Sequence, residues 1–177
     1  MAKALLPIPV KYFVAILYHD PKALQAAKET ITHIWGPLDF EGTDHRFDVS
    51  DYYQAEMGAP LQRRLIFFET LLPPAEIVDI KLRCNDIEKT LAVDRNRTVN
   101  LDAGYMDHNK VILASAKEAG QKIYLDSGIY ADIMGRYEKG RYRPFDWTFP
   151  DFRDGRYDEE FLAVRRIYLA QRKGVIE

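Results

Sequence analysis

Apolar residues run almost without a break through positions 10–18, VKYFVAILY. A short run rich in β-branched and aromatic residues is typical of a strand covered on both faces, so we predict a central strand here. The period then becomes helical between Asp20 and Pro21, which fit the N-cap and first position of a helix, and Gly36 and Pro37, which end it. The apolar positions of this amphipathic helix are Leu24, Ala27, Ile31 and Ile34.

The pattern continues with two expected strands at 38–48 and 61–71, and Pro73 and Pro74 then open a second helix. Its apolar positions fall on one helical face and are Ile77, Ile80, Cys84, Ile87 and Leu91. Strand patterns follow at 97–106, 110–117 and 121–137, a reversal at 138–140 leads to a strand in RYRPF, 146–157 is expected to be a coil pinned by its rings, and Asp158 caps a last helix.

This order begins β-α-β-β-α-β, the split pattern of ferredoxin-like folds. We therefore predict an α+β fold with a ferredoxin-like βαββαβ core, extended by additional antiparallel hairpin strands and a C-terminal helix. No repeat, low-complexity tract or linker divides the 177 residues, so residues 1–177 are expected to form a single α+β domain.

Composition restricts the partners and the cellular location expected for this domain. The 25 basic residues nearly cancel the 27 acidic ones, so no overall field attracts nucleic acid or anionic membrane, and a site for a polyanion must be local. The lone cysteine, Cys84, excludes an intrachain disulfide and suits a reducing compartment. The N-terminus has no apolar run of signal-peptide length, and 18 apolar residues occur together nowhere. We expect a cytoplasmic protein that does not enter a membrane.

The strictest alternation in the chain, QKIYLDSGIYADIMGRY at 121–137, has an unusual polar half. Because side chains on a strand alternate, its apolar half is expected in the core, namely Ile123, Leu125, Ile129, Ala131 and Ile133. The opposite face would then carry Lys122, Tyr124, Asp126, Gly128, Tyr130 and Asp132. The same rule applied to VNLDAGY at 99–105 places Asn100, Asp102 and Gly104 on one face, which an antiparallel sheet could align with that set.

We hypothesise that this polar sheet face binds a ligand, with Asp102, Asp126 and Asp132 accepting a cation or a hydroxyl and Lys122 contacting an anion. Hard divalent cations such as Mg²⁺ prefer oxygen ligands, and lysine binds phosphate as a point charge. The expected ligand is a nucleotide or a phosphorylated small molecule with a divalent cation. Tyr105 ends the Asp102 strand but points to the opposite face, so it joins the site only where the strand twists or bulges.

Two plainer interpretations of this face stay open: a solvated surface with cross-strand Lys–Asp pairs, and a homodimer surface. If the protein is an enzyme, metal-assisted phosphoryl or nucleotidyl transfer suits these groups best. Covalent catalysis is not indicated, because no serine has a nucleophile-elbow context and Cys84 falls on a buried helix face. The four histidines have no metal-binding spacing.

The segment 136–157 supports a different hypothesis, a non-enzymatic module that binds RNA or another protein. Six basic residues alternate there with seven aromatic ones, and arginine beside exposed rings can follow a nucleic-acid backbone and stack bases. Four acidic residues in the same window dilute the charge, so RNA is the less favoured partner. The stretch SDYYQAEMG at 50–58 is expected to form a loop or a short helical turn that could overhang a cleft.

Four stretches together resemble an uncharacterised bacterial family of unknown function, a single domain of about this length: DYYQAEMG at 51–58, VNLDAGY at 99–105, KIYLDSGIYADI at 122–133 and WTFPDFR at 147–153. The family pattern has Pro at the position of Ala103 and Glu at that of Asp132. Some members carry a GTP-binding label, which the resemblance would extend to this chain. The sequence itself contains no P-loop and no dinucleotide-binding glycine motif, and NKVI at 109–112 has Ile112 where a guanine-reading motif needs Asp.

Overall fold

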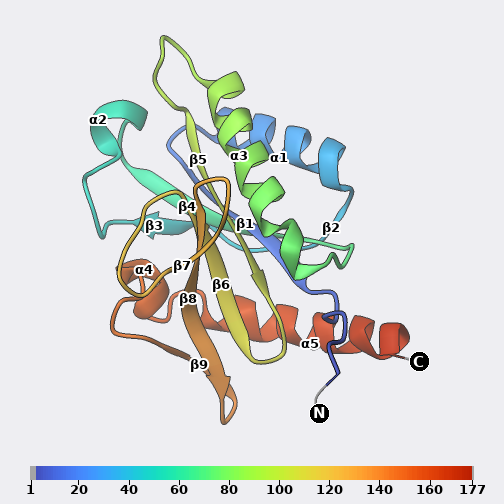
Figure 1. Ribbon diagram of the computed structural model, residues 1–177. Helices are drawn as coiled ribbons and strands as arrows, with labels where there is room; N and C mark the ends of the chain where they lie inside the picture. Colours follow the sequence, from blue (N-terminus) through green and yellow to red (C-terminus); the bar gives the residue numbers. More distant parts are fainter. Residues whose placement is uncertain (1–2, 177) are drawn as a thin grey trace.

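The computed structural model describes residues 3–176 and arranges them around one nine-stranded antiparallel sheet (Figure 1). The path through the sheet is β2-β4-β1-β5-β6-β8-β7, with β3 paired to β4 and β9 paired to β8. The strands are β1 (Lys11–Tyr18), β2 (Leu38–Glu41), β3 (His45–Phe47), β4 (Leu61–Phe68), β5 (Val99–Met106), β6 (Lys110–Ser115), β7 (Ile123–Asp126), β8 (Ile129–Glu138) and β9 (Arg141–Pro144). The helices are α1 (Pro21–Trp35), α2 (Gln54–Met57), a 3₁₀ turn (Pro74–Glu76), α3 (Ile77–Leu91), α4 (Pro150–Arg153) and α5 (Asp158–Ile176).

The central strand predicted at 10–18 is confirmed as β1, whose eight residues are all buried between β4 and β5. The predicted first helix is also confirmed, because the Asp20 side chain accepts a hydrogen bond from the Lys22 backbone N–H at 2.9 Å and Pro21 follows it. Helices α1 and α3 lie on one face of the sheet, where Ile31 and Cys84 are fully buried with the β1 side chains Val14 and Ile16.

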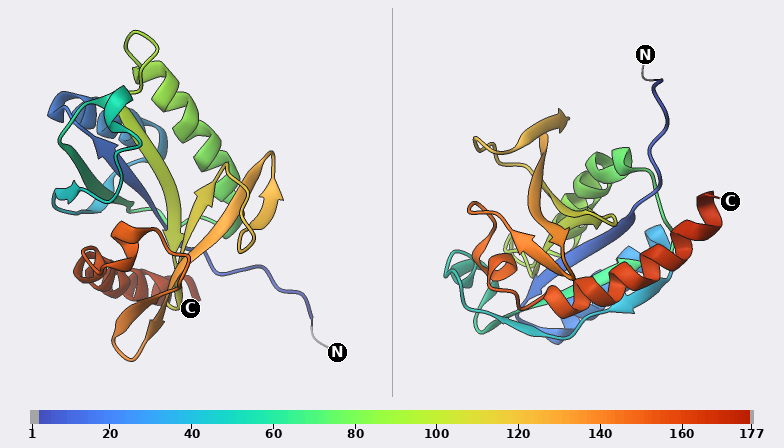
Figure 2. Two further views of the ribbon diagram at one scale, coloured as in Figure 1. Left: turned by 90° about the vertical axis from the view of Figure 1, so that its left-hand side faces the viewer. Right: turned by 90° about the horizontal axis from the view of Figure 1, so that it is seen from below.

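Helix α5 covers the opposite face, so that the molecule has three layers (Figure 2). Phe161 of α5 packs edge-on against Phe13 of β1 and Phe67 of β4, and Val164 is fully buried beside them. Large aromatic side chains bury much apolar surface, so this second core also contributes to stability. The α+β class, the large antiparallel sheet and the C-terminal helix are therefore as predicted. None of the described helices is both long and apolar enough to span a membrane.

Two predicted elements differ in detail. The strand expected at 38–48 is two short strands, β2 and β3, which both pair with β4 and are separated by residues 42–44. The polar residues that weakened the pattern mark this interruption. The coil at 146–157 contains the short helix α4, and its Phe152 is buried against α5 as expected, whereas Trp147 and Phe149 stay about 45% exposed.

The prediction of one long strand at 121–137 is wrong. This segment is a hairpin of β7 and β8 with Ser127 (φ 50°) and Gly128 (φ 77°) at its turn. Two residues with positive φ form the tight turn that suits a right-twisted hairpin. The register shift between Tyr124 and Asp126 then brings Ile123 opposite Ala131, so the alternation of polar and apolar residues continues across the turn. Strand β7 lies at the edge of the sheet, and consequently Ile123 and Leu125, predicted in the core, are 59% and 37% exposed.

Candidate functional site

The site begins where two neighbouring strands of the sheet separate. Strands β5 and β6 pair from Met106–Val111 to Gly104–Leu113, and the register given by the described residues ends there, although both strands continue. Leu101 lies beyond this point on β5. Its backbone N–H donates to Oε1 of Glu88 at 2.6 Å, and its carbonyl accepts from Nζ of Lys81 at 2.8 Å. Two side chains of α3 thus take the place of a strand partner.

This role explains why α3 carries charged residues on its buried face. Lys81 lies one turn after Ile77, and Glu88 lies one turn after Cys84, so both point toward the sheet. A buried polar group is stable when it is hydrogen-bonded, and the edge of β5 supplies the partners. Burial raises the pKa of Glu88 above its ordinary value, although the Leu101 N–H and the positive charges of Lys81 and Arg97 act in the opposite direction.

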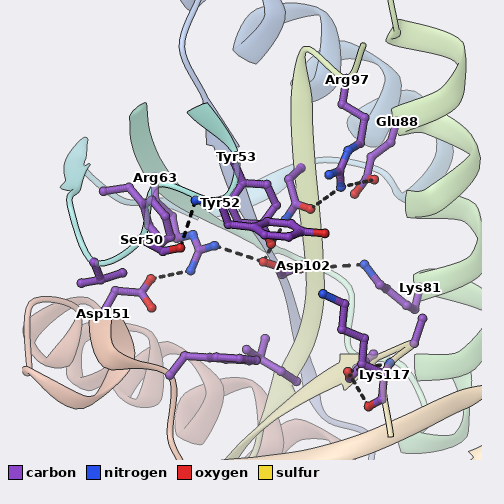
Figure 3. Close-up of a pocket in the computed structure, with 18 of the residues that line it drawn as sticks. Ser50, Tyr52, Tyr53, Arg63, Lys81, Glu88, Arg97, Asp102, Lys117 and Asp151 are labelled. Carbon is purple, nitrogen blue, oxygen red and sulfur yellow. Dashed lines mark hydrogen bonds and ion pairs between the residues drawn. The ribbon is translucent and has the colours of Figure 1, made fainter. Parts of the chain in front are cut away.

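A cavity of about 540 Å³ occupies the space opened by this separation (Figure 3). Its wall is built from the loop after β3, from β4, α3, β5, the end of β6 with the residues after it, and the start of α4. The charged residues that line it are Arg63, Lys81, Glu88, Arg97, Asp102, Lys117, Lys122 and Asp151. The aromatic ones are Phe47, Tyr52, Tyr53 and Phe149.

Arg63 holds one wall of the cavity together. Its guanidinium bonds Asp151 of α4 on one side and Asp102 of β5 on the other, the second at 3.1 Å. It also lies over the Phe47 ring, with 4.8 Å from Cζ to the ring centroid. The hydroxyl of Tyr157 donates to the same Asp151 carboxylate at 3.0 Å. Because Arg63 and Asp151 are buried, each needs the other to offset the loss of hydration.

Arg97 fixes the far end of the cavity. It makes a two-pronged ion pair with Glu56 of α2, at 2.9 Å from Nε to Oε1 and 2.7 Å from Nη2 to Oε2. Its Nη1 donates to the side-chain carbonyl of Asn100 at 2.9 Å and lies 3.6 Å from Glu88. Asn100 in turn donates to Asp102 at 3.0 Å. A continuous network of charged and amide groups therefore runs from α4 to α2.

The rim opposite this network carries lysines and rings. Nζ of Lys122 donates to Ser115 Oγ at 2.8 Å, lies 3.7 Å from Asp132 and faces the Phe149 ring at 5.8 Å. Nζ of Lys117 lies 4.9 Å from the centroid of the exposed Tyr52 ring, and within the described chain it contacts no carboxylate. Figure 3 shows the side chains of Lys81 and Lys117 extending into the same space in front of Asp102.

The residues predicted as a ligand site are divided by the structure. Asp102 and Lys122 line the cavity. Asp132 lies behind Lys122 with its side chain 2% exposed, and burial raises its pKa. Tyr124, Tyr130 and Asp126 belong to the β7–β8 hairpin outside the cavity lining, where the two tyrosine rings pack edge-on at 5.4 Å. Tyr105 points to the helical face, as alternation required, and packs against Tyr12 at 5.6 Å.

The three carboxylates expected to accept a cation therefore do not form one cluster. Asp102 is paired with Arg63 and lies 3.8 Å from Lys81, Asp132 faces Lys122, and Asp126 caps the hairpin turn through the Ser127 N–H. Among residues 3–176, no three side chains of the metal-binding types come together. The cavity offers lysines, rings and amides where the sequence suggested a carboxylate site.

Several lining residues were missed by the sequence reasoning, yet three of them left a signal. Arg63 is in phase with Leu61, Leu65 and Phe67, so strand alternation places a charge on an apolar face. Lys81 and Glu88 occupy the apolar face of α3 in the same way. A charge at a core position requires a partner, and such positions could have been searched for. Arg97 and Asp151, which lie outside regular apolar patterns, left no such signal.

The fold and the cavity define an α+β protein with a charged, ring-lined pocket built into its sheet. A family model described as Domain of unknown function (DUF4416) matches residues 8–168, and the chain belongs to this family, which confirms the resemblance. The searches of curated proteins and of solved structures found no match. The four stretches that carried the resemblance all reach the cavity, through Tyr52 and Tyr53, through Asn100 and Asp102, through Lys122, and through Phe149 to Asp151.

Proposed function

We propose that the protein binds a nucleotide, or another phosphorylated small molecule with a flat ring, in the cavity between β5 and β6. The observation that carries this proposal is the joint presence of lysines and exposed rings in one cavity large enough for such a ligand. Five cationic residues line the cavity against three carboxylates, a surplus of two. Arg63 and Arg97 are held in close ion pairs, and Lys81 and Lys122 lie 3.8 Å from Asp102 and 3.7 Å from Asp132. Among the described residues Lys117 has no carboxylate partner, so the free positive charge lies chiefly with Lys117.

The orientation of the ligand follows from this distribution. The phosphate would contact Lys117 and Lys122, where Ser115 adds a hydroxyl. The ring would lie toward Tyr52 and Tyr53, because aromatic faces stack on flat groups. Asn85 lines the cavity one helical turn after Lys81 and supplies an amide that can donate and accept. We also propose that a divalent cation such as Mg²⁺ binds together with the phosphate of the ligand.

Two broader features belong to the same proposal. The strand order β2-β4-β1-β5, with α1 and α3 as crossovers on one face, supports a ferredoxin-like core, to which β6–β9 and α5 are additions. A cytoplasmic location is supported by the free thiol of Cys84. Neither feature identifies a reaction, and the proposal is one of binding.

Thermal unfolding in the presence of nucleotides, sugar phosphates and inorganic phosphate, with and without Mg²⁺, tests the proposal. A ligand at 100 times its Kd should add about 2.7 kcal/mol to the free energy of unfolding. Lys117→Gln should weaken binding by roughly tenfold or more, since a hydrogen bond to a charged group contributes about 1.5–3 kcal/mol. The matched control is Lys89→Gln, which removes the same charge from the exposed side of α3.

The variant Asn85→Leu tests the contact at the ring end of the ligand separately from the contacts at its phosphate end. We expect it to weaken a nucleotide and to leave inorganic phosphate unchanged, because only the ring end would meet the amide. A well-folded protein that no phosphorylated compound stabilises would overturn the proposal, and so would a hit that Lys117→Gln and Lys89→Gln weaken equally.

A further inference from the structure

A second group of cations lies on the β6–β8–β9 end of the sheet, away from the cavity. In the register, Lys110 of β6 is opposite Arg136 of β8, and Arg136 is opposite Arg143 of β9. Side chains directly opposite one another share a face of an antiparallel sheet, so three cations stand in one cross-strand row. Like charges in such positions destabilise a sheet, so a row of them indicates a role other than stability, such as binding an anionic partner.

The acids near this cationic row only partly offset it. Glu138 is shared by two arginines, at 3.5 Å from Arg136 and 3.7 Å from Arg143, and Asp107 pairs with Lys110. Arg141, at the exposed end of β9, has no ion pair among the described residues. The side chains of the row are 40% to 60% exposed, so the surplus charge faces solvent.

A pair of stacked rings, one of them exposed, lies on the same edge. Phe145 and Trp147 are parallel, with 4.8 Å between ring centroids and 1° between ring planes, and Trp147 is 45% exposed. Two hydrogen bonds to β8 hold this segment in place, from Trp147 Nε1 to the Ile133 carbonyl at 2.9 Å and from Thr148 Oγ1 to the Met134 carbonyl at 2.6 Å. The rings thus occupy the edge of β8 between the parts that pair with β7 and with β9.

We propose that this edge binds single-stranded nucleic acid, with bases stacking on Trp147 and the phosphates contacting Arg136, Arg143 and Arg141. Ile133 and Arg136 are three residues apart, about 10 Å along β8, so rings and cations are close enough for one strand to contact both. A flat, rigid ring flanked by exposed arginines is what base stacking and backbone tracking require. The site is independent of the cavity and of its ligand.

The structure also shortens the RNA-binding segment that the sequence suggested, residues 136–157. Arg156 is held by Asp154 and Asp48, and Arg153 donates to the Asp146 carbonyl. These two arginines stabilise the fold, which leaves residues 136–147 as the binding segment. Charge complementarity favours a nucleic acid over a protein partner, because the edge presents exposed arginines beside an exposed ring.

Fluorescence anisotropy with labelled single-stranded RNA and DNA oligonucleotides tests the proposal on the full chain. We expect wild type to bind with an affinity that falls steeply with salt, and Arg136→Gln/Arg143→Gln to weaken binding at least tenfold. The variant should also lower the slope of log affinity against log salt by about 0.7 for each lost contact. The matched control is Arg83→Gln/Lys89→Gln, which removes two charges from the exposed side of α3 and should change little.

A second readout reports on the stacking itself. The chain has two tryptophans, so Trp35→Phe leaves Trp147 as the sole tryptophan, and an RNA strand should quench its selectively excited emission. Lys117→Gln, the cavity variant, should bind RNA as wild type does, so that failure of the cavity proposal is distinguishable from failure of this one. The inference is overturned if folded wild type binds no oligonucleotide at low salt, if Trp147 emission does not respond, or if the α3 control loses as much affinity as the β8–β9 variant.

Discussion

Arg63 and Asp102 stand on β4 and β5, the two strands that flank β1, and their side chains meet across it at 3.1 Å. The β1 residue opposite Asp102 is Ala15, whose methyl group leaves room for the arginine to pass. The guanidinium then continues to Asp151 of α4. One side chain consequently joins the sheet to the segment that leads into α5 and forms the wall of the cavity.

Arg63→Met should lower the free energy of unfolding by about 3–5 kcal/mol, because it leaves the buried Asp151 carboxylate without its charge partner. Chemical denaturation measures the change. The control is Arg64→Met at the next position, where a partly exposed side chain pairs with Glu41 and Asp44 and the expected loss is about 0–1 kcal/mol. Equal losses in the two variants would contradict the assigned role of Arg63.

Glu88 should make the stability depend on pH in a defined direction. Burial raises its pKa in the folded state, whereas in the unfolded chain the pKa returns to about 4.3. Between these two values the folded state holds the proton more tightly, so the contribution of Glu88 to stability is lost as the pH rises through that window. Below the unfolded pKa the contribution is fully present.

Glu88→Gln removes this titration and keeps a side-chain oxygen for the Leu101 N–H. We expect the variant to gain stability relative to wild type as the pH rises from about 4.3. Urea denaturation of both proteins at a series of pH values gives the difference. A difference that stays constant over the whole range would show that the Glu88 pKa is not raised.

Gly104 should tolerate no side chain. A Cβ there would lie 2.5 Å from the Ile112 carbonyl oxygen and 2.6 Å from the Phe13 ring, so Gly104→Ala must push β6 or the aromatic core aside. We expect a loss of about 1–3 kcal/mol, the usual result of overpacking. In Gly120→Ala the new methyl group meets no atom within 4 Å, and stability should change little. Thermal or chemical denaturation compares the two.

Cys84 should be inert in the folded protein. Its side chain is fully buried under α1, and burial raises the pKa of the thiol to about 12, so almost no thiolate forms near neutral pH. Because the chain has one cysteine, labelling with a chromogenic disulfide reagent reports on this site alone. The reaction should be slow in buffer and should accelerate with denaturant as the chain unfolds. Rapid labelling of the native protein would contradict the buried placement.

The sequence predicts the layers of this molecule better than its cavity. Continuous apolar runs and helical periods identify β1, α1, α3 and α5, because each of these elements buries a face whatever its neighbours are. The β7–β8 turn was missed because the register shift between Tyr124 and Asp126 lets the alternation continue across it, and the Ser127–Gly128 pair was the only local sign of the turn.

The cavity depends on pairs that are distant in sequence. Asp102 and Lys122 were predicted from their strands, but the partner of Asp102 is Arg63, and Lys122 donates to Ser115. Nothing local to β5 indicates that its part before Gly104 is separated from β6. The only sequence signal of that separation is the presence of charged residues on apolar faces, at Arg63, Lys81 and Glu88.

The replacement of a strand partner by α3 at Leu101 has a consequence for motion. A backbone amide in the interior of a sheet normally exchanges its hydrogen only when strands come apart. The Leu101 amide is held by a carboxyl group on a helix, so its exchange should follow displacements of α3 from the sheet and the protonation of Glu88. Through this single bond, the protection of one amide on an interior strand depends on a helix side chain that lines the pocket.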